Sequence, residues 1–332
     1  MPFAEIYAQI LGNAEIKSYL CNPETNQRLT TVDKTRLFLL LAATMLLAAC
    51  GNDDNDVRPE DDTSINANAN DASGNADLAR WELPHSTAGN LFIPHRTSDG
   101  LMNYCMEYSL TANHSQWVAY RYDTKLASSV TSRSDAWSSD PALNNYRDHQ
   151  VSTGYFPGYN RGHLVGSAER YYSREANEQT FYMSNMSPML GEFNTNDWGN
   201  GIETLIREWG RAMANGDTLY VVKGGTIGDP LGYISVNTTS GKTVRMTVPR
   251  HYFAACLKRL ASGYLYAIGF WIEHKDHRLG GDKQKAKALA RESACTVDEL
   301  ERLTGLDFFC NVPDTYETRV EAKMDVTEWS GL

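Results

Sequence analysis

Arg161 and His163 stand on either side of Gly162 in the stretch Asn-Arg-Gly-His that begins at Asn160. A histidine can be neutral near pH 7 and accept a proton from water. An arginine can pair with a phosphate or brace a carboxylate. Gly162 lets the backbone turn sharply or approach another strand closely. These residue types predict a base aimed at an anionic group, and a simple polar turn is the alternative interpretation.

A second group of polar residues lies downstream, around a predicted helix. Asn194 precedes this helix, and Glu203 and Arg207 lie four residues apart on one helical face. An amide oxygen is a neutral ligand that suits Mg²⁺, an ion that keeps most of its waters. Glu203 can hold those waters and Arg207 can brace Glu203. The alternative for this pair is an exposed salt bridge, which contributes little to stability.

The elements that must position these residues follow from periodicity and turn signals. Trp198 and Trp209 belong to a run of apolar residues at helical spacing that ends at 215–216, and Thr296 begins a second helix with a capping box. Runs of β-forming residues predict strands at 103–110, 117–122, 179–188, 218–225, 242–249, 251–257 and 263–272. We expect an α+β fold, a central antiparallel sheet with flanking helices. No nucleotide-binding glycine motif opens a helix, so a nucleotide cofactor is not indicated.

The N-terminal part has the features of an export signal. Lys34 and Arg36 precede an apolar run that ends in Leu-Ala-Ala-Cys50. The run is short for a membrane span and is typical of a signal-peptide core. Its ending resembles a bacterial lipoprotein cleavage box, which implies lipid on the Cys50 sulfur, and Gly51 favours the outer membrane by the same resemblance. An ordinary signal peptide with an incidental cysteine is the alternative.

Charge and composition divide the chain into three parts. The net charge is −10, but residues 51–80 alone hold eight acidic residues against two arginines. This stretch has almost no large apolar residues and predicts a disordered tether. We therefore expect a signal peptide with an N-terminal extension of uncertain start (1–49), a lipid-anchored acidic tether (50–80) and a folded domain (81–332). The domain is only mildly acidic, so a local basic cleft for a polyanion is compatible with the composition.

Four cysteines lie in the folded domain, where export would permit disulfides. We expect Cys295 to pair with Cys310, because a short helix separates them, and Cys105 to pair with Cys256. Buried free thiols are the alternative. No pair of cysteines has zinc-finger spacing, so a structural zinc site is not expected.

The stretch 273–277 offers Glu273, His274 and His277 as three further candidate ligands. It lacks the helical spacing of a zinc-protease site. We interpret it as a solvated loop that follows a strand.

The residues from 91 to 322 resemble the DNA/RNA non-specific endonucleases of the ββα-metal type. The family motif Asp-Arg-Gly-His is matched at 160–163, with Asn160 in the place of aspartate. Further matches follow in the family's order: WVAY at 117–120, Arg133 before DPAL at 140–143, SNMSP at 184–188, NTNDW at 194–198, IETLIR at 202–207 and the C-terminal stretches 296–309 and 312–317. One such motif is a weak signal, whereas several in the same order are a strong one.

This resemblance implies an enzyme that hydrolyses DNA and RNA to 5′-phosphorylated products with little sequence preference. His163 would be the general base, and Asn194 would be the sole direct protein ligand of one Mg²⁺, with Mn²⁺ as a substitute. The remaining residues carried over are those that would stabilise charge or support the site: Arg133, Arg161, Glu203, Arg207, Asn185 and Asn160 itself.

The chain departs from the family pattern at three places. Asn160 lacks the charge of the usual aspartate, which leaves a non-catalytic nucleic-acid-binding lipoprotein as an alternative. A phosphodiesterase for small extracellular nucleotides is a further alternative. One extra residue between Trp198 and Glu203 predicts a shift of phase at the start of the helix. Ala254 stands where the family often has lysine.

Overall fold

The structure is a computed structural model that describes residues 66–332. The predicted signal peptide and the predicted lipid attachment at Cys50 lie outside the described residues. Within the described part of the chain, no helix is both long and apolar enough to pass through a membrane.

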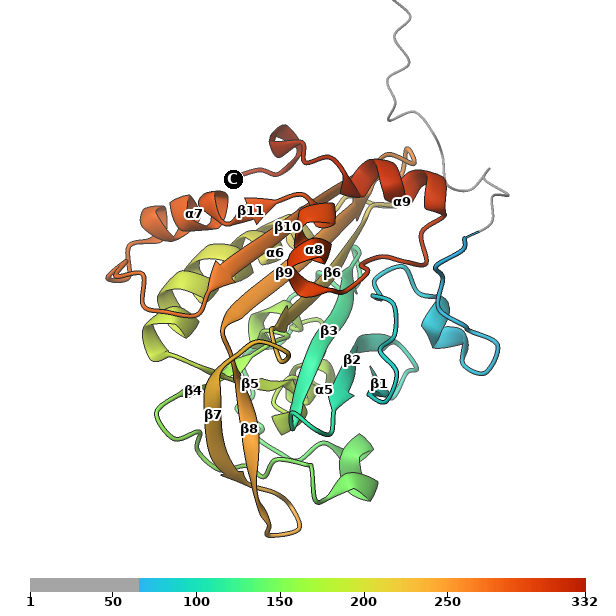
Figure 1. The fold of residues 1–332 in the computed structure, drawn as a ribbon. Helices are drawn as coiled ribbons and strands as arrows, with labels where there is room; N and C mark the ends of the chain where they lie inside the picture. Colours follow the sequence, from blue (N-terminus) through green and yellow to red (C-terminus); the bar gives the residue numbers. More distant parts are fainter. Residues whose placement is uncertain (1–65) are drawn as a thin grey trace, which may run out of the picture. The chain divides into compact units, whose positions relative to one another are not determined.

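A seven-stranded antiparallel sheet forms the centre of the domain (Figure 1). Its strand order is β1-β2-β3-β6-β9-β10-β11. The bounds are β1 (Leu91–Arg96), β2 (Met102–Ser109), β3 (His114–Tyr122), β6 (Thr218–Gly225), β9 (His251–Arg259), β10 (Leu265–Glu273) and β11 (Ala294–Cys295). The expected α+β fold with a central antiparallel sheet is confirmed, and the predicted strands at 103–110, 117–122, 218–225, 251–257 and 263–272 all belong to this sheet.

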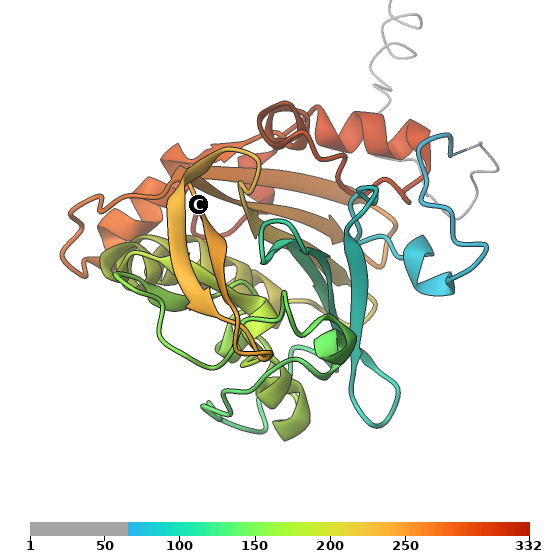
Figure 2. The ribbon, with the colours of Figure 1, turned by 60° about the horizontal axis from the view of Figure 1, so that its bottom comes forward.

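Two smaller antiparallel pairs stand beside the main sheet. They are β4 (Asn160–His163) with β5 (Met186–Met189), and β7 (Pro230–Asn237) with β8 (Thr243–Pro249). The β7–β8 hairpin lies next to β4 and β5 in both views (Figures 1 and 2). A third apolar cluster joins them, since Met186 of β5 packs with Ile234 and Val248 of the hairpin.

Helices cover both faces of the main sheet. Their bounds are α5 (Arg174–Gln179), the π-helix η6 (Phe193–Glu203), α6 (Thr204–Arg211), α7 (Lys283–Glu292), α8 (Val297–Thr304) and α9 (Asp314–Glu321). Short 3₁₀ turns are η2 (Ala76–Ala79), η3 (Pro141–Tyr146), η4 (Ser167–Glu169), η5 (Met183–Asn185) and η7 (Val326–Glu328). The helices η6, α6 and α7 pack on one face, and α8 and α9 pack on the other.

Strand parity explains these two layers of core. Val221 of β6 faces η6 and α6, whereas its neighbour Val222 faces α8 and α9. Alternate residues of a strand point to opposite faces, so continuous apolar runs serve both layers. The run around Val221 is therefore buried on both sides of the sheet.

The predicted helix that follows Asn194 begins as a π-helix, in which the backbone bonds from i to i+5. A π-helix has more residues in each turn than an α-helix, so these turns accommodate the extra residue between Trp198 and Glu203. A side chain at Gly199 would also lie only 2.8 Å from the Asn194 carbonyl oxygen. The phase shift expected from the sequence thus has a structural counterpart.

Other predicted elements differ in extent. The run 179–188 was predicted to be one strand, but only β5 is extended, and a helical turn precedes it. The predicted helix at 296–306 is confirmed as α8, whose Thr296 side chain accepts a hydrogen bond from the Glu299 amide at 3.2 Å.

The predicted tether extends less far than residue 80. Asn66 donates to the carbonyl oxygens of Cys310 and Val312, and Asn68 donates to the carboxylates of Asp307 and Glu317. Side-chain amides fasten residues 66–80 to the C-terminal part of the domain. Low hydrophobicity predicted disorder here, but these hydrogen bonds order the segment without a large apolar contact.

Neither predicted disulfide is present, and all four cysteines in the described residues are free. Cys105 and Cys256 belong to the cores on opposite faces of the sheet. Cys295 lies against Gly269 of β10, whereas Cys310 lies beside the Leu83 carbonyl. The side chains therefore point into separate environments, which the spacing along the sequence did not reveal.

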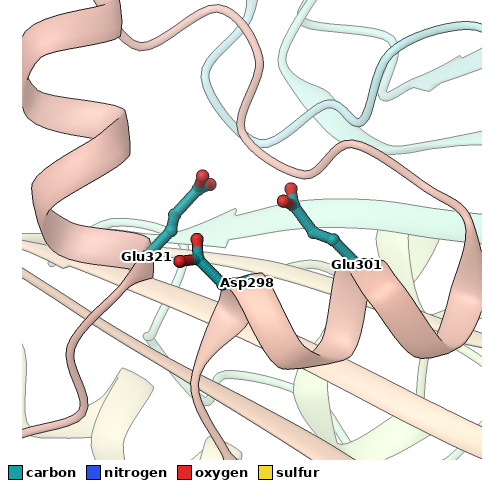
Figure 3. A group of neighbouring side chains, drawn as sticks. All are labelled: Asp298, Glu301 and Glu321. Atoms are coloured by element: carbon teal, nitrogen blue, oxygen red, sulfur yellow. The ribbon is translucent and has the colours of Figure 1, made fainter.

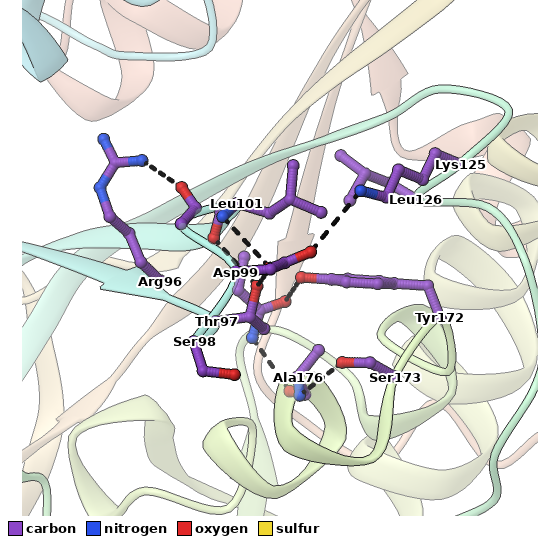
Figure 4. Close-up of polar contacts among 12 residues, drawn as sticks. Arg96, Thr97, Ser98, Asp99, Leu101, Lys125, Leu126, Tyr172, Ser173 and Ala176 are labelled. Carbon is purple, nitrogen blue, oxygen red and sulfur yellow. Dashed lines mark hydrogen bonds and ion pairs between the residues drawn. The ribbon is translucent and has the colours of Figure 1, made fainter.

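The turn between β1 and β2 is tied to the helical segment α5 (Figure 4). Ser98 donates from its amide and its hydroxyl to Glu175, and the Thr97 hydroxyl donates to Asp99 at 2.6 Å. Ser173 caps α5 by accepting from the Ala176 amide at 3.0 Å. These bonds fix the end of the molecule that carries α5.

Candidate active site

The strand pair β4–β5 presents His163. Gly162 opposes Ser187, and a side chain at Gly162 would collide with Met189. The predicted close approach at Gly162 is therefore present. The next residues are held by Asn185, which accepts from the Val165 amide at 2.9 Å and donates to the Val165 carbonyl at 3.0 Å. This bracing fixes the chain just after His163.

The His163 ring is held edge-on by Phe181, with ring centroids 4.8 Å apart, and tilted against Trp137 at 5.5 Å. Its Nε2 is buried and has no hydrogen-bond partner, whereas Nδ1 is not buried. Burial, and after it the positive charges of Arg133, Lys223 and Arg161, together lower the pKa of His163 to about 3. The imidazole is neutral near pH 7, and Nδ1 is the ring nitrogen that is not fully buried.

Arg133 and Arg161 lie against the two aromatic rings that hold His163. The guanidinium of Arg133 is 4.8 Å from the centre of Phe181, and that of Arg161 is 3.6 Å from the centre of Trp137. Arg133 also pairs with Asp135 at 2.8 Å, where both side chains are about half exposed. Two solvent-accessible cations thus flank the base, an arrangement that suits a phosphodiester.

Glu203 and Arg207 form the predicted pair, with 3.3 Å between Oε1 and Nη1. The pair is not exposed, because each side chain retains only about a fifth of its surface, 18% and 20%. Glu203 packs against Gly166, where an added Cβ would lie 2.6 Å from Oε1. Burial raises the pKa of Glu203 and so does the charge of Glu169, while Lys223, Arg207 and Arg133 oppose that rise.

Asn194 lies in the first turn of η6, whose last residue is Glu203. Its amide donates to the Leu190 carbonyl at 2.8 Å. Its side-chain carboxamide makes no hydrogen bond within residues 66–332 and is not buried. An uncommitted neutral oxygen on a rigid helix fits a hydrated Mg²⁺, so the residues present suit the implied metal.

Asn160 is exposed at the start of β4. Its side chain faces Gly191, where an added Cβ would lie 3.5 Å from Nδ2. Asn160 therefore lies beside the segment that leads into η6. A charge is missing here, but the position still adjoins the element that carries Asn194.

The sequence analysis did not predict a buried ion pair that lies near Glu203. Lys223 Nζ lies 2.6 Å from Glu169 Oε2, and neither side chain has exposed surface. The same Oε2 accepts from the Gly166 amide at 2.6 Å. The signal in the sequence is a lysine inside the apolar strand 218–225, because a buried lysine requires a partner.

The position of Lys223 is also relevant to Ala254, which stands where the family often has lysine. Lys223 on β6 is directly opposite Ala254 on β9. Directly opposed residues of an antiparallel pair point to the same face. Lys223 therefore carries a positive charge on the face of the sheet to which Ala254 points, although this charge is buried and paired with Glu169.

His274 corrects the interpretation of 273–277 as a solvated loop. It is 2% exposed, and its Nδ1 lies 2.9 Å from the Pro249 carbonyl. Its Nε2 accepts from the Leu190 amide at 2.8 Å. Since the Leu190 carbonyl in turn accepts from the Asn194 amide, His274 supports the first turn of η6. His277 bonds to Asp197 of the same helix at 2.7 Å, so these histidines face different partners rather than one metal.

The candidate site consists of two antiparallel strands followed by a helix. The first strand carries a neutral histidine flanked by arginines, and the helix carries an asparagine whose side chain is not engaged. This arrangement defines a metal-dependent nuclease of the ββα type. The family described as DNA/RNA non-specific endonuclease matches residues 94–315. The chain belongs to this family.

Two relatives that are named as nucleases agree with this membership. A nuclease of Nostoc sp. is 32% identical over 235 residues, which cover 67% of this chain and 79% of that protein. Mitochondrial endonuclease G of Homo sapiens is 28% identical over 160 residues, which cover 47% of this chain and 50% of the human protein. A solved structure of a complex of EndoG with EndoGI aligns with a TM-score of 0.46 at 18% identity, over 66% of this chain and 86% of that one.

Proposed function

We propose that this nuclease hydrolyses phosphodiester bonds in both DNA and RNA with little sequence preference and leaves 5′-phosphates. The observation that carries the proposal is the state of His163, a neutral base held by two aromatic rings that carry Arg133 and Arg161. Asn194 belongs to the same strand–strand–helix unit. Its free carboxamide supports the metal part of the proposal.

His163 would take the proton from the attacking water at Nδ1. Its pKa of about 3 in the free protein makes it a weak base, partly because Arg133, Lys223 and Arg161 repel a proton. A bound phosphodiester brings negative charge and offsets that repulsion, so substrate itself would raise the proton affinity of His163.

Asn194 would be the direct protein ligand of one Mg²⁺, with Mn²⁺ as a substitute. The ion would polarise the phosphate and stabilise the leaving 3′-oxygen. Glu203 would orient water in this region, and Arg207 fixes its carboxylate through the 3.3 Å pair. Arg133 and Arg161 would hold the phosphate, and Arg133 would also stabilise the charge that develops on it.

Contacts to phosphate and sugar carry no sequence information, which accounts for the proposed lack of preference. The proposal extends to location: an exported protein attached through lipid on Cys50 to the outer membrane. It rests on the residues before and at Cys50.

The test is degradation of plasmid DNA and of a structured RNA with Mg²⁺ and with Mn²⁺. His163→Ala should lower the rate by roughly 10²–10⁴-fold, and Asn194→Ala should abolish the cleavage that Mg²⁺ or Mn²⁺ supports. His85→Ala, at an exposed histidine, is the matched control and should cleave normally. End-labelling of the products reports which side of the bond keeps the phosphate.

Two results would replace the proposal. Binding of DNA with no cleavage under either metal would identify a non-catalytic binding protein. Cleavage of a dinucleotide but not of long DNA would identify a phosphodiesterase for small substrates.

A further inference from the structure

Three carboxylates converge on the face of the sheet opposite to His163. Asp298 and Glu301 come from α8, and Glu321 is the last residue of α9 (Figure 3). One oxygen from each lies within 4.8 Å of the others. Both helices pack on the core that faces away from η6, so this group is separate from the candidate active site.

Glu321 is the residue that requires explanation. It is only 4% exposed, and its Oε1 is buried with no hydrogen-bond partner. Figure 3 shows its carboxylate directed toward those of Asp298 and Glu301. A buried carboxylate without a partner is costly, and a helix C-terminus adds partial negative charge at this position.

The surroundings of Glu321 supply more negative charge and no compensation. Asp307 and Glu317 lie nearby, and both already accept from the Asn68 amide at 3.1 Å. Within residues 66–332, no Lys, Arg or His lies within ion-pair distance of Asp298, Glu301 or Glu321. The two outer acids thus have a donor, whereas Oε1 of the buried Glu321 has none. Glu301 is partly engaged, because its Oε1 accepts from the Phe308 amide at 2.7 Å.

We infer that Asp298, Glu301 and Glu321 bind a divalent cation, with Ca²⁺ as the preferred ion. Calcium takes oxygen ligands at about 2.3–2.6 Å and tolerates irregular geometry, so ligands on opposite sides of it stand up to about 5 Å apart. Magnesium is smaller and keeps an octahedral shell of waters, and so it suits this group less. The bound ion joins α8 to α9 and stabilises the C-terminal part of the domain.

The experiment measures thermal unfolding and calorimetric binding with CaCl₂ in the Asn194→Ala background, which removes the proposed catalytic metal ligand. Saturating Ca²⁺ should raise Tm by roughly 5–10 °C. Adding Glu321→Gln should remove this rise, because glutamine has the same shape but no charge. Glu292→Gln is the matched control, since Glu292 is the exposed last residue of α7, and it should leave the rise intact.

Asp298→Asn is a second variant at an exposed site, and it should weaken Ca²⁺ binding while the protein stays folded. The inference is overturned if Ca²⁺ gives no rise in Tm, or if Glu321→Gln leaves the rise unchanged. A third outcome would also overturn the inference: the parent shows no response to Ca²⁺, and Glu321→Gln is more stable than the parent in EDTA. This result would show that Glu321 is protonated and binds no cation. None of these readouts depends on nuclease activity.

Discussion

Lys223 and Glu169 form an ion pair of 2.6 Å with no exposed surface on either side chain. The pair links β6 of the main sheet to the loop after β4, because Glu169 also holds the Gly166 amide. Glu203 packs on the same Gly166. The single positive charge of Lys223 therefore lies in a region that contains the carboxylates of Glu169 and Glu203. Both carboxylates contact Gly166, which lies just after the strand that carries His163.

Removing the lysine should be strongly destabilising. Lys223→Met leaves Glu169 buried without a counter-charge, and we expect the free energy of unfolding to fall by about 3–5 kcal/mol. Urea denaturation measures this fall. Adding Glu169→Gln to Lys223→Met should recover part of it, because the uncompensated charge is then absent.

The cross-strand relationship provides a sharper test. In the double variant Lys223→Val, Ala254→Lys, the ammonium group enters from the strand opposite but on the same face of the sheet. We expect this double variant to be more stable than Lys223→Val alone and to cleave DNA faster than it. Equal stability of the two would contradict the idea that the positions are interchangeable.

His274 should affect metal affinity although it contacts no proposed metal ligand. His274→Phe keeps a ring in the buried site but removes the acceptor for the Leu190 amide. The first turn of η6 then loosens around Asn194, and we expect the Mg²⁺ concentration for half-maximal cleavage to rise, while the rate at saturating Mg²⁺ changes less. His85→Phe serves as the control. A fall in the saturated rate with unchanged metal dependence would argue against this positioning role.

Stability should fall on the acid side through His114. This residue is fully buried, and its ring nitrogens contact the Ser115 carbonyl at 2.5 Å and the Ser187 hydroxyl at 2.7 Å. Burial lowers the pKa of His114 from 6.5 to about 4. The unfolded chain therefore binds a proton below pH 6.5 that the folded protein refuses until about pH 4.

The expected loss across that window is ~3 kcal/mol from His114, and His163 adds to it in the same direction. Urea denaturation at a series of pH values measures the slope. His114→Gln lowers stability overall but should flatten this slope. A variant with a slope parallel to that of the parent would show that other groups govern the acid limb.

The sequence was most informative where short-range chemistry sets the outcome. The N-cap at Thr296, the strands of the main sheet and the order of the family motifs could all be predicted, because each depends on neighbouring residues. The separate residues of the site, such as His163 and Asn194, could also be named in advance. Their distance from each other in the fold was not available from spacing.

The errors share one cause, which is contact between segments far apart in the chain. Cys105 and Cys256 were expected to pair, but strand parity directs them to opposite faces of the sheet. His274 was expected in solvent, but its two ring nitrogens meet Pro249 and Leu190. Composition predicted disorder up to residue 80, yet amides from Asn66 and Asn68 fasten that segment to the domain.

The sequence by itself determined which functional groups this protein has and the nuclease family to which it belongs, because those depend on residue identity and order. Only the tertiary structure decided their ionisation and their partners. The low pKa of His163, the pairing of Lys223 with Glu169 and the unpartnered oxygen of Glu321 all arise from burial. Burial removes water from a charge, and which charges lose their water is set by how strands and helices pack, not by their neighbours in the chain.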